Sequence, residues 1–440
     1  MSYGWVGQLI RVNLTDESVC TEPLDLHGAE LYAGGRGLAE KYYLDGAAPK
    51  ADPLEPANRL IFLTGPLTGT LGTCVGSCEL VTKAPMTGSL GACSLYGRFG
   101  PELKFAGYDG IVLEGRAKAP RYLFIDDGRI ELRDASSFWG KEAPEAVDLL
   151  REATDGEAKV ACIGPAGENC VTFAVILNDE YRTAGRAGFG AVMGSKNVKA
   201  IVVRGTKSVK AAKPKEFVES CLKARSVMRA QHAAGDYPPH EAETFRFPND
   251  GEGLEQEMGW RFGLGCGMGS AEAASEADSL CERLGMDSVA LSATLARAMN
   301  LYGKGRITPK DTGLDLSYGN DAAIVALTKM TGYRDGFGDT LAQGQGRMAA
   351  AFGEPELPKP ARAEKTPPQN EAAADALEEC EALAALLDSA GICLFTGCAI
   401  GLPEIAALFR TCTGLDVSDE ELLRIGERIC ALEREAAAEA

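Results

Sequence analysis

The spacing of apolar residues changes once along this chain of 440 residues, near residue 210. Before that point, short apolar or β-branched runs are bounded by glycine, proline or Asp-Gly pairs, which is typical of β-strands. These runs lie at 8–14, 60–64, 110–114, 122–125 and 199–203. Beyond residue 213 the apolar residues recur at helical spacing. The pattern therefore predicts an α+β protein, with a β-sheet-rich N-terminal domain followed by α-helical domains.

Two charged, proline-containing stretches interrupt the helical part, at 236–252 and 354–370, and both are typical of loops or linkers. The domains predicted from these breaks are a β-rich domain over 1–210, a first helical domain over 211–353, a proline-rich linker over 354–371 and a second helical domain over 372–440. Within the first domain, Asp127-Gly128 predicts a hairpin turn and 143–154 predicts a helix.

The formal charge of −18 argues against nucleic acid and anionic membranes as partners, because an acidic surface repels both. No run of apolar residues is long enough to span a bilayer, and the N-terminus has the pattern of a strand rather than of a signal peptide. Most of the fourteen cysteines stand singly in apolar surroundings. They are typical of reduced thiols in a cytoplasmic protein and are compatible with an anaerobic cell.

Three glycine-rich stretches stand out, at 65–70, 88–100 and 185–194. Glycine at this density lets the backbone approach a flat, phosphate-bearing ligand, with free amides as donors. None of the three has the spacing of the dinucleotide-binding fingerprint. Taken alone, each stretch is more often a set of turns in a β-domain than a ligand-binding loop.

Two short signals in the helical part are alike. Glu282-Arg-Leu-Gly285-Met286-Asp287 and Asp388-Ser-Ala-Gly391-Ile392-Cys393 each place an acid three residues before a glycine. The glycine is expected to end a helix as its C-cap. The carboxylates then lie near a helix junction, where they can accept hydrogen bonds from amino or ring N–H groups, although each signal alone is more often a simple helix end.

Histidine-based metal chemistry is improbable, since the three histidines form no HExxH or similar pattern. No Ser/His/Asp arrangement can be argued from the sequence. No Cys-x-x-Cys pair occurs, and the tightest cysteine spacing is Cys74-x-x-x-Cys78.

Together, these pieces resemble the aldehyde:ferredoxin oxidoreductase family, tungsten enzymes that carry a bis-pterin cofactor. The resemblance covers 4–206, 253–347 and 386–434. Its most specific runs lie at 65–70, 81–88, 102–109, 163–169 and 184–197. The resemblance implies that the N-terminal sheet is a base on which two pterins lie, and that two helical domains close over it.

The resemblance also implies a set of cofactor-binding residues, namely Ser94, Arg186, Ala187, Glu282, Gly285, Asp287, Asp388 and Gly391. At Ser94 the family usually has an asparagine whose backbone carbonyl helps to hold a magnesium ion bridging the pterin phosphates, and a backbone role survives that change. The activity it implies is oxidation of an aldehyde to a carboxylic acid at a tungsten or molybdenum centre. Glu257 resembles the family's acid beside the metal, a candidate general acid/base. Electrons would leave through a [4Fe–4S] cluster to ferredoxin or another redox protein.

The chain departs from the family at the cluster. The family's Cys-x-x-Cys-x-x-x-Cys run reads Gly259 to Cys266 here, and only Cys266 and Cys393 remain at the iron–sulfur ligand positions. Two thiolates fall short of the four that a cubane cluster ordinarily takes, so a [4Fe–4S] cluster is doubtful. In one arrangement, Cys74 and Cys78 complete a relocated set of four. Cys78 itself stands where the family has an arginine, and the segment before Leu386 is shortened.

Three hypotheses remain open at this point. The chain is a working oxidoreductase with altered electron transfer, a degenerate non-catalytic homologue or subunit that binds a pterin cofactor or a partner without turnover, or a truncated minimal form of the family. Assembly as a homo- or hetero-oligomer is compatible with all three.

Overall fold

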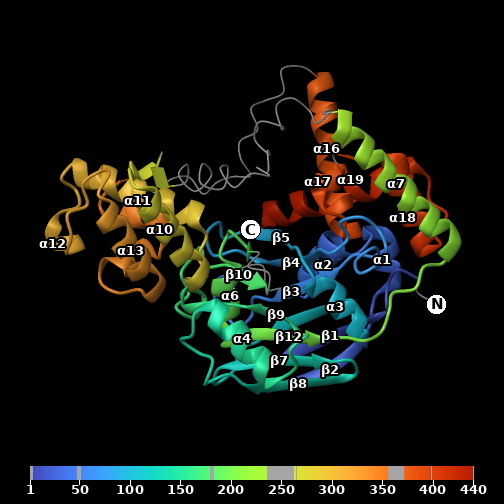
Figure 1. Ribbon diagram of the computed structural model, residues 1–440, viewed down its shortest axis with the longest axis horizontal. Helices are drawn as coiled ribbons and strands as arrows, with labels where there is room; N and C mark the ends of the chain where they lie inside the picture. Colours follow the sequence, from blue (N-terminus) through green and yellow to red (C-terminus); the bar gives the residue numbers. More distant parts are fainter. Residues whose placement is uncertain are drawn as a thin grey trace.

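The computed structural model describes residues 3–46, 51–178, 183–234, 262–263, 265–354, 371–397 and 399–439. Two six-stranded sheets pack against each other in the N-terminal half with a hydrophobic core between them, and helical groups flank them on two sides (Figure 1). The predicted α+β architecture, a β-rich N-terminal domain followed by helical domains, is confirmed.

The first sheet, sheet A, has the order β2-β1-β6-β3-β4-β5. Only β1 and β6 run parallel; the other neighbours are antiparallel. Its strands are β1 Gln8–Asn13, β2 Ser18–Pro23, β3 Leu60–Thr64, β4 Cys78–Lys83, β5 Leu90–Leu95 and β6 Gly110–Glu114.

The second sheet, sheet B, has the order β11-β10-β9-β12-β7-β8. The predicted hairpin joins β7 to β8, and Asp127 at its turn has a φ of 49°, which Asp tolerates better than most residues. The strands are β7 Arg121–Asp126, β8 Arg129–Asp134, β9 Lys159–Cys162, β10 Ile176–Asn178, β11 Thr183–Ala184 and β12 Val198–Arg204.

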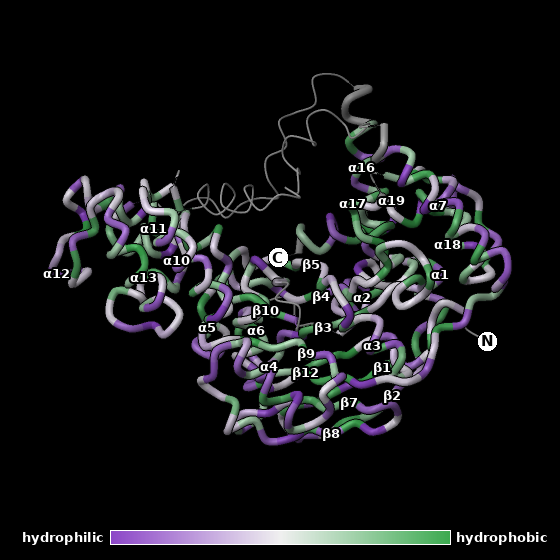
Figure 2. Tube along the Cα trace, in the orientation of Figure 1, coloured by the Kyte–Doolittle hydropathy of each residue, from purple (hydrophilic) through white to green (hydrophobic). Residues whose placement is uncertain are grey.

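The period of two in the strands divides the core. In β3, Leu60 and Phe62 point into the space between the sheets, whereas Ile61 and Leu63 point to the outer face of sheet A. Helices α3 Phe99–Ala106 and α6 Phe189–Ser195 add side chains to the core between the sheets. The strands that line this core carry many of the hydrophobic residues along the trace (Figure 2).

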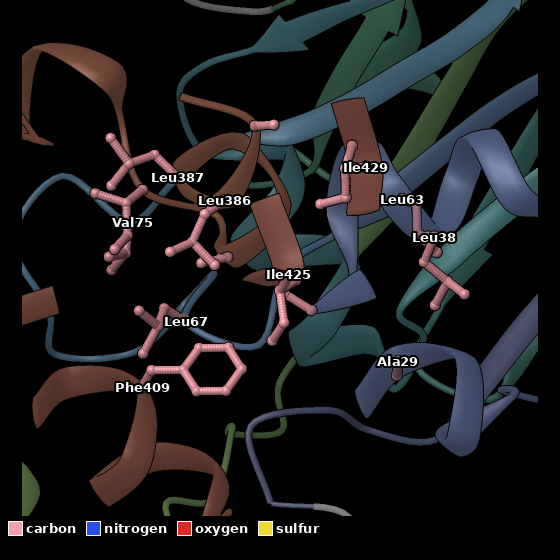
Figure 3. Packing of buried hydrophobic residues seen from close by; sticks show 14 of the residues in the cluster. Ala29, Leu38, Leu63, Leu67, Val75, Leu386, Leu387, Phe409, Ile425 and Ile429 are labelled. Carbon is pink, nitrogen blue, oxygen red and sulfur yellow. The ribbon is translucent and has the colours of Figure 1, made fainter. Parts of the chain in front are cut away.

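The outer face of sheet A is covered by helices from both ends of the chain. Figure 3 shows Leu38 and Leu63 of the N-terminal domain in one cluster with Leu386, Ile425 and Ile429. The helices are α1 Leu26–Tyr32, α2 Gly35–Leu44, α7 Pro214–Ala234, α16 Glu371–Ala390, α17 Leu394–Gly397, α18 Leu402–Thr413 and α19 Asp419–Glu439. Helix α7 packs against α18, so it lies with the C-terminal helices rather than with the helices that follow it in sequence.

A second helical group packs at the end of sheet B, against α4 Ala143–Ala153 and the short α5 Pro165–Glu168. Its members are α10 Ala271–Leu284, α11 Ser288–Gly303, α12 Pro309–Thr312, α13 Asp321–Tyr333, α14 Phe337–Leu341 and α15 Gly344–Ala351. The stretches expected as linkers, 236–252 and most of 354–370, lie outside the described residues. In the described part, no helix combines the length and apolarity that crossing a membrane requires.

Candidate cofactor site

The first acid–glycine signal forms the end of α10. Gly285 has a φ of 78° and donates its N–H to the carbonyl of Glu282 at 3.2 Å. The N–H of Met286 reaches the carbonyl of Cys281 at 2.8 Å. This pair of bonds is a Schellman motif, so the predicted C-cap role of Gly285 is confirmed.

The second signal has the same geometry at the end of α16. Gly391 has a φ of 86° and donates its N–H to the carbonyl of Asp388 at 3.3 Å, while Ile392 donates to Leu387 at 2.9 Å. Glu282 and Asp388 therefore occupy the same position of the same helix ending, one in each helical group.

Each helix end docks on a glycine of the N-terminal domain. A Cβ atom on Gly164, after β9 of sheet B, would lie 2.4 Å from the carbonyl oxygen of Leu284. A Cβ atom on Gly65, after β3 of sheet A, would lie 2.2 Å from the carbonyl carbon of Ala390. Only glycine permits approaches this close, so the two loops fix where the two helix ends lie.

The loop at Gly65 is held by a buried lysine. Lys104 is 1% exposed, donates from Nζ to the carbonyl of Gly65 at 2.7 Å and lies 3.5 Å from the carboxylate of Asp109. Burial lowers the pKa of Lys104, and the carboxylate of Asp109 opposes that shift. Lys104 thus holds the carbonyl of Gly65 in the loop on which the second helix end docks.

Around Asp388 lies a buried polar group. Arg36 donates from Nη1 to Oδ2 of Asp388 at 3.1 Å. On sheet A, Ser94 of β5 donates from Oγ to Oε2 of its cross-strand partner Glu79 at 3.0 Å. Glu79 is 1% exposed; burial raises its pKa well above the usual range, and the negative charge of Asp388 raises it further.

Several buried side-chain atoms near Asp388 lack a hydrogen-bond partner of normal geometry among the described residues. They include Oε1 of Glu79, Nε of Arg36, Oε2 of Glu40 and the hydroxyl of Thr73. Buried polar atoms are normally paired, and each one left alone costs free energy. The residues therefore fit a ligand that brings its own N–H and oxygen groups, as the pyrimidine ring of a pterin does.

The other half of the site lies on sheet B. Val175 donates its N–H to the carbonyl of Gly285 at 2.9 Å, and Asp287 donates its N–H to the carbonyl of Phe173 at 3.0 Å. The carboxylate of Asp287 accepts from the N–H of Val289 at 3.1 Å and caps α11. The first helix end is thus joined to the N-terminal domain through backbone bonds.

The turn that carries Arg186 and Ala187 lies between the two halves. The carbonyl of Ala187 accepts from Met86 at 3.2 Å, beside the start of β5. Four residues beyond Arg186, Gly190 donates to Ala174 at 3.0 Å, and Ala174 forms a β-bridge with Met286 of the first helix end. The exposed Arg186 thus stands on a turn that contacts sheet A and leads directly to the first helix end.

The four cysteines considered as cluster ligands lie in different parts of the fold. Cys266 is buried in the α10–α15 group, donates to the carbonyl of Ser292 at 3.4 Å, and has its pKa raised to about 12 by burial. Cys78 is buried between the sheets, whereas Cys393 donates its N–H to the carbonyl of Cys74 at 3.0 Å.

Among the described residues, no three His, Cys, Asp or Glu side chains gather as metal ligands. The structure therefore does not assemble Cys74, Cys78, Cys266 and Cys393 as four ligands, and the thiols present do not fit a [4Fe–4S] cluster. Phe262, at a family cysteine position, is wholly buried in the helical core. The candidate acid Glu257 lies outside the described residues.

Sequence reasoning missed Arg36 and Glu79. Glu79 is the one carboxylate in the otherwise apolar run from Cys78 to Val81. A charged residue isolated in this way is a signal from which it could have been found. Arg36 contacts a residue 352 positions away, and no local pattern announces such a pair.

Comparison with known proteins agrees with this geometry. Residues 9–205 match the family model described as aldehyde ferredoxin oxidoreductase, N-terminal domain, and residues 228–361 and 354–440 match the model of domains 2 and 3 of that family. The tungsten-containing aldehyde ferredoxin oxidoreductase of Pyrococcus furiosus is 34% identical over 534 aligned positions, covering 98% of this chain and 88% of that protein. This chain fills only about 430 of those positions, so the relative carries about a hundred residues without a counterpart here.

Two further proteins extend the likeness. The WOR-like subunit of an aliphatic sulfonate oxidoreductase from Pyrococcus furiosus is 29% identical over 80% of this chain and 68% of that protein. The solved active-site complex BamBC of benzoyl coenzyme A reductase superimposes with a TM-score of 0.89, over 100% of this chain and 90% of that one, at 22% identity, which speaks for the fold alone. The two matching domain models and the 34% identity show that the chain belongs to the aldehyde ferredoxin oxidoreductase family.

Proposed function

We propose that this chain is a bis-pterin oxidoreductase that binds tungsten or molybdenum and oxidises an aldehyde to a carboxylic acid. The observation that carries the proposal is the pair of identical helix ends, each bearing a carboxylate and each seated on a glycine of a different sheet. Membership of a family whose relative is a tungsten-containing aldehyde oxidoreductase supports the reaction class.

In this proposal, two sets of residues hold the cofactor. Asp388 and Glu79 accept from the amino and ring N–H groups of one pterin; burial raises the pKa of Asp388, and Arg36 opposes that rise. Glu282 and Asp287 stand in the corresponding place for the other pterin. The carbonyls of Ser94 and Ala187 and the side chain of Arg186 would hold the phosphate edge of the cofactor together with a magnesium ion, whose charge would balance that of the phosphates. When bound, the metal centre supplies the two-electron chemistry.

Proton movement is assigned to Glu257, which remains a proposal because it lies outside the described residues. The variant Glu257→Gln is expected to keep its metal and lose aldehyde-dependent turnover at least 100-fold, since a positioned general acid/base typically contributes about that factor or more. Unchanged turnover in a metal-loaded Glu257→Gln protein would remove this assignment.

A second function is supported by the thiols, which do not complete a cluster site. We propose as the alternative that the chain is a subunit or non-catalytic homologue whose electron path runs through a partner protein. The name of the sulfonate oxidoreductase relative, a WOR-like subunit, agrees with this role. In either case ferredoxin or a ferredoxin-like partner takes the electrons, and we propose a cytoplasmic, oxygen-free setting for the thirteen free thiols of the described part.

The test is reduction of a viologen dye by aldehydes, using the chain purified without oxygen from cells supplied with tungstate or molybdate. Asp388→Asn is expected to lose both metal and activity, whereas Asp416→Asn, an exposed change in the same helical group, is expected to keep both. A metal-loaded wild-type chain that reduces no dye with any aldehyde would reject the first function and favour the subunit role.

A further inference from the structure

Two cysteines from distant parts of the chain meet beside the second helix end. Cys74 lies in the loop between β3 and β4, and Cys393 follows Gly391. The N–H of Cys393 lies 3.0 Å from the carbonyl oxygen of Cys74. With standard bond lengths, that contact keeps the two Cα atoms within about 7 Å of each other. Disulfide bonds usually span about 4.4–6.8 Å between Cα atoms.

The surroundings hold both residues in place. Cys74 has a φ of 55°, an uncommon conformation for a residue with a side chain. It is kept there by backbone bonds on both sides, since Val75 next to it accepts from Gly69 at 3.0 Å. Val75 belongs to the same buried cluster as Leu387, just before the second helix end (Figure 3). Such over-determined backbone strain is concentrated at functional positions.

Solvent also reaches the pair. Cys74 is exposed and Cys393 is half-buried, while the next residues, Leu394 and Phe395, are 38% and 44% exposed. Cys78, the nearest cysteine in sequence to Cys74, is buried between the sheets on the opposite face of β4 from Glu79.

We propose that Cys74 and Cys393 form a redox-active dithiol that closes into a disulfide by exchange with the disulfide of a small-molecule thiol. The exposed thiolate of Cys74 attacks one sulfur of the reagent and releases one reduced thiol. The thiolate of Cys393 then attacks the Cys74 sulfur and releases the second. The two protein thiols are oxidised by two electrons, the reagent disulfide is reduced to two thiols, and the protons lost by the cysteines pass to them.

Closure has a consequence for the site. The bond would fasten the loop after Gly65 to the segment after Gly391, across the place where the second helix end meets sheet A. In a reducing cytoplasm, disulfides of this kind are usually transient and redox-sensing.

The test uses the full chain as purified without oxygen, equilibrated with defined ratios of reduced and oxidised glutathione. Exchange is quenched with acid, the free thiols are then alkylated with N-ethylmaleimide in denaturant near neutral pH, and the peptides are mapped by mass spectrometry. We expect free thiols to fall by two from fourteen as the buffer becomes oxidising, with a linked peptide pair that contains Cys74 and Cys393. Reduction should restore all fourteen.

Variants make the result specific. Cys74→Ser and Cys393→Ser should each abolish the linked pair. In Cys74→Ser, Cys393 should react little with oxidised glutathione. Cys20→Ser and Cys380→Ser, which remove other exposed thiols, should leave the pair intact. Two free, alkylated thiols at Cys74 and Cys393 throughout the titration, or a stable glutathione adduct that never closes, would overturn the proposal.

Metal and pterin content measured on the same samples separates this result from the proposed function. A chain without cofactor that still forms the bond supports the dithiol and counts against the oxidoreductase. A metal-loaded chain that never forms the bond overturns the dithiol and leaves the proposed oxidoreductase function standing.

Discussion

Replacing Gly65 with alanine should detach the C-terminal helices from sheet A. The added Cβ would lie 2.2 Å from the carbonyl carbon of Ala390 and 2.3 Å from the nitrogen of Gly391, where ordinary contact begins at 3.4 Å. The helix end would have to retreat by about 1 Å, because both neighbours are backbone atoms that cannot rotate away. That retreat also strains the 3.0 Å bond from Leu67 to Ala390.

The expected cost follows from these contacts. Overpacking a rigid site typically costs about 1–3 kcal/mol, and a strained buried backbone bond adds about 1 kcal/mol, so the docking should weaken by about 3 kcal/mol. Trp5 reports on it, because its ring packs edge-on against Phe409 of α18 at 6.4 Å between centroids. The assay is urea unfolding followed by Trp5 fluorescence, with Trp139 and Trp260 changed to phenylalanine in every protein compared.

The matched control is Gly128→Ala, whose Cβ would have nothing within 4 Å and whose φ is not positive. It should stay within about 0.5 kcal/mol of the parent protein. Gly164→Ala, at the other helix end, should weaken the α10–α15 group by a similar amount while leaving the Trp5 transition unchanged. If Gly65→Ala unfolds within 0.5 kcal/mol of the parent, the close approach does not exist and the reasoning about both helix ends fails.

Three further changes test the buried charges of the site. Arg36→Met should cost about 2–3 kcal/mol in urea unfolding, because it leaves the half-buried carboxylates of Asp388 and Glu433 without their cation; a loss under 1 kcal/mol would contradict the pairing. The raised pKa of Glu79 means that the folded protein holds a proton the unfolded chain releases, so its stabilising contribution is complete below about pH 4.5 and is lost as the pH rises through the folded pKa. Glu79→Gln should flatten that decline between pH 4.5 and 9 in urea midpoints, and an unchanged slope would count against it. Lys104→Met should destabilise the N-terminal domain by about 3 kcal/mol, since Asp109 and two loop carbonyls lose a buried donor; a neutral change would show that the lysine anchors nothing.

Local structure could be derived from the sequence where one physical signal dominates. The continuous apolar run at 60–64 and the helical spacing of 271–284 correspond to β3 and α10, because a strand buried on both faces is apolar throughout and a helix turns one apolar face toward a core. The glycines at 285 and 391 end their helices as expected, since the left-handed conformation favours glycine.

Other elements carried no such signal. Strands β4 and β5 mix glycine, serine, cysteine and glutamate with apolar residues, so neither shows a clean apolar–polar alternation. Helix α2 is short, and it begins at Gly35 within a run of glycines that predicts a turn. All three elements are in contact with segments distant in sequence: α2 packs on β4, β5 and α16, and such contacts leave no local trace in the sequence.

The residues of the candidate site also divide into those with a local sequence signal and those without one. The acids at 282 and 388 were found from a repeated local spacing, whereas Arg36 and Glu79 become visible only when strands and helices from distant segments are placed together. The cysteines illustrate the limit most clearly. Family positions pair Cys266 with Cys393, but the fold buries the first in a helical core and brings the second to Cys74.

The proposed function requires that the two helix ends, each docked on a glycine, form a binding site for a pair of pterins. The most direct measurement is the amount of tungsten, molybdenum and released pterin per chain in protein purified without oxygen from cells supplied with both metals. The prediction is two pterins for each metal atom in the parent chain, and loss of both in Gly65→Ala and Gly164→Ala. Protein that is folded, as judged by Trp5 fluorescence, and yet contains neither pterin nor metal would contradict the account.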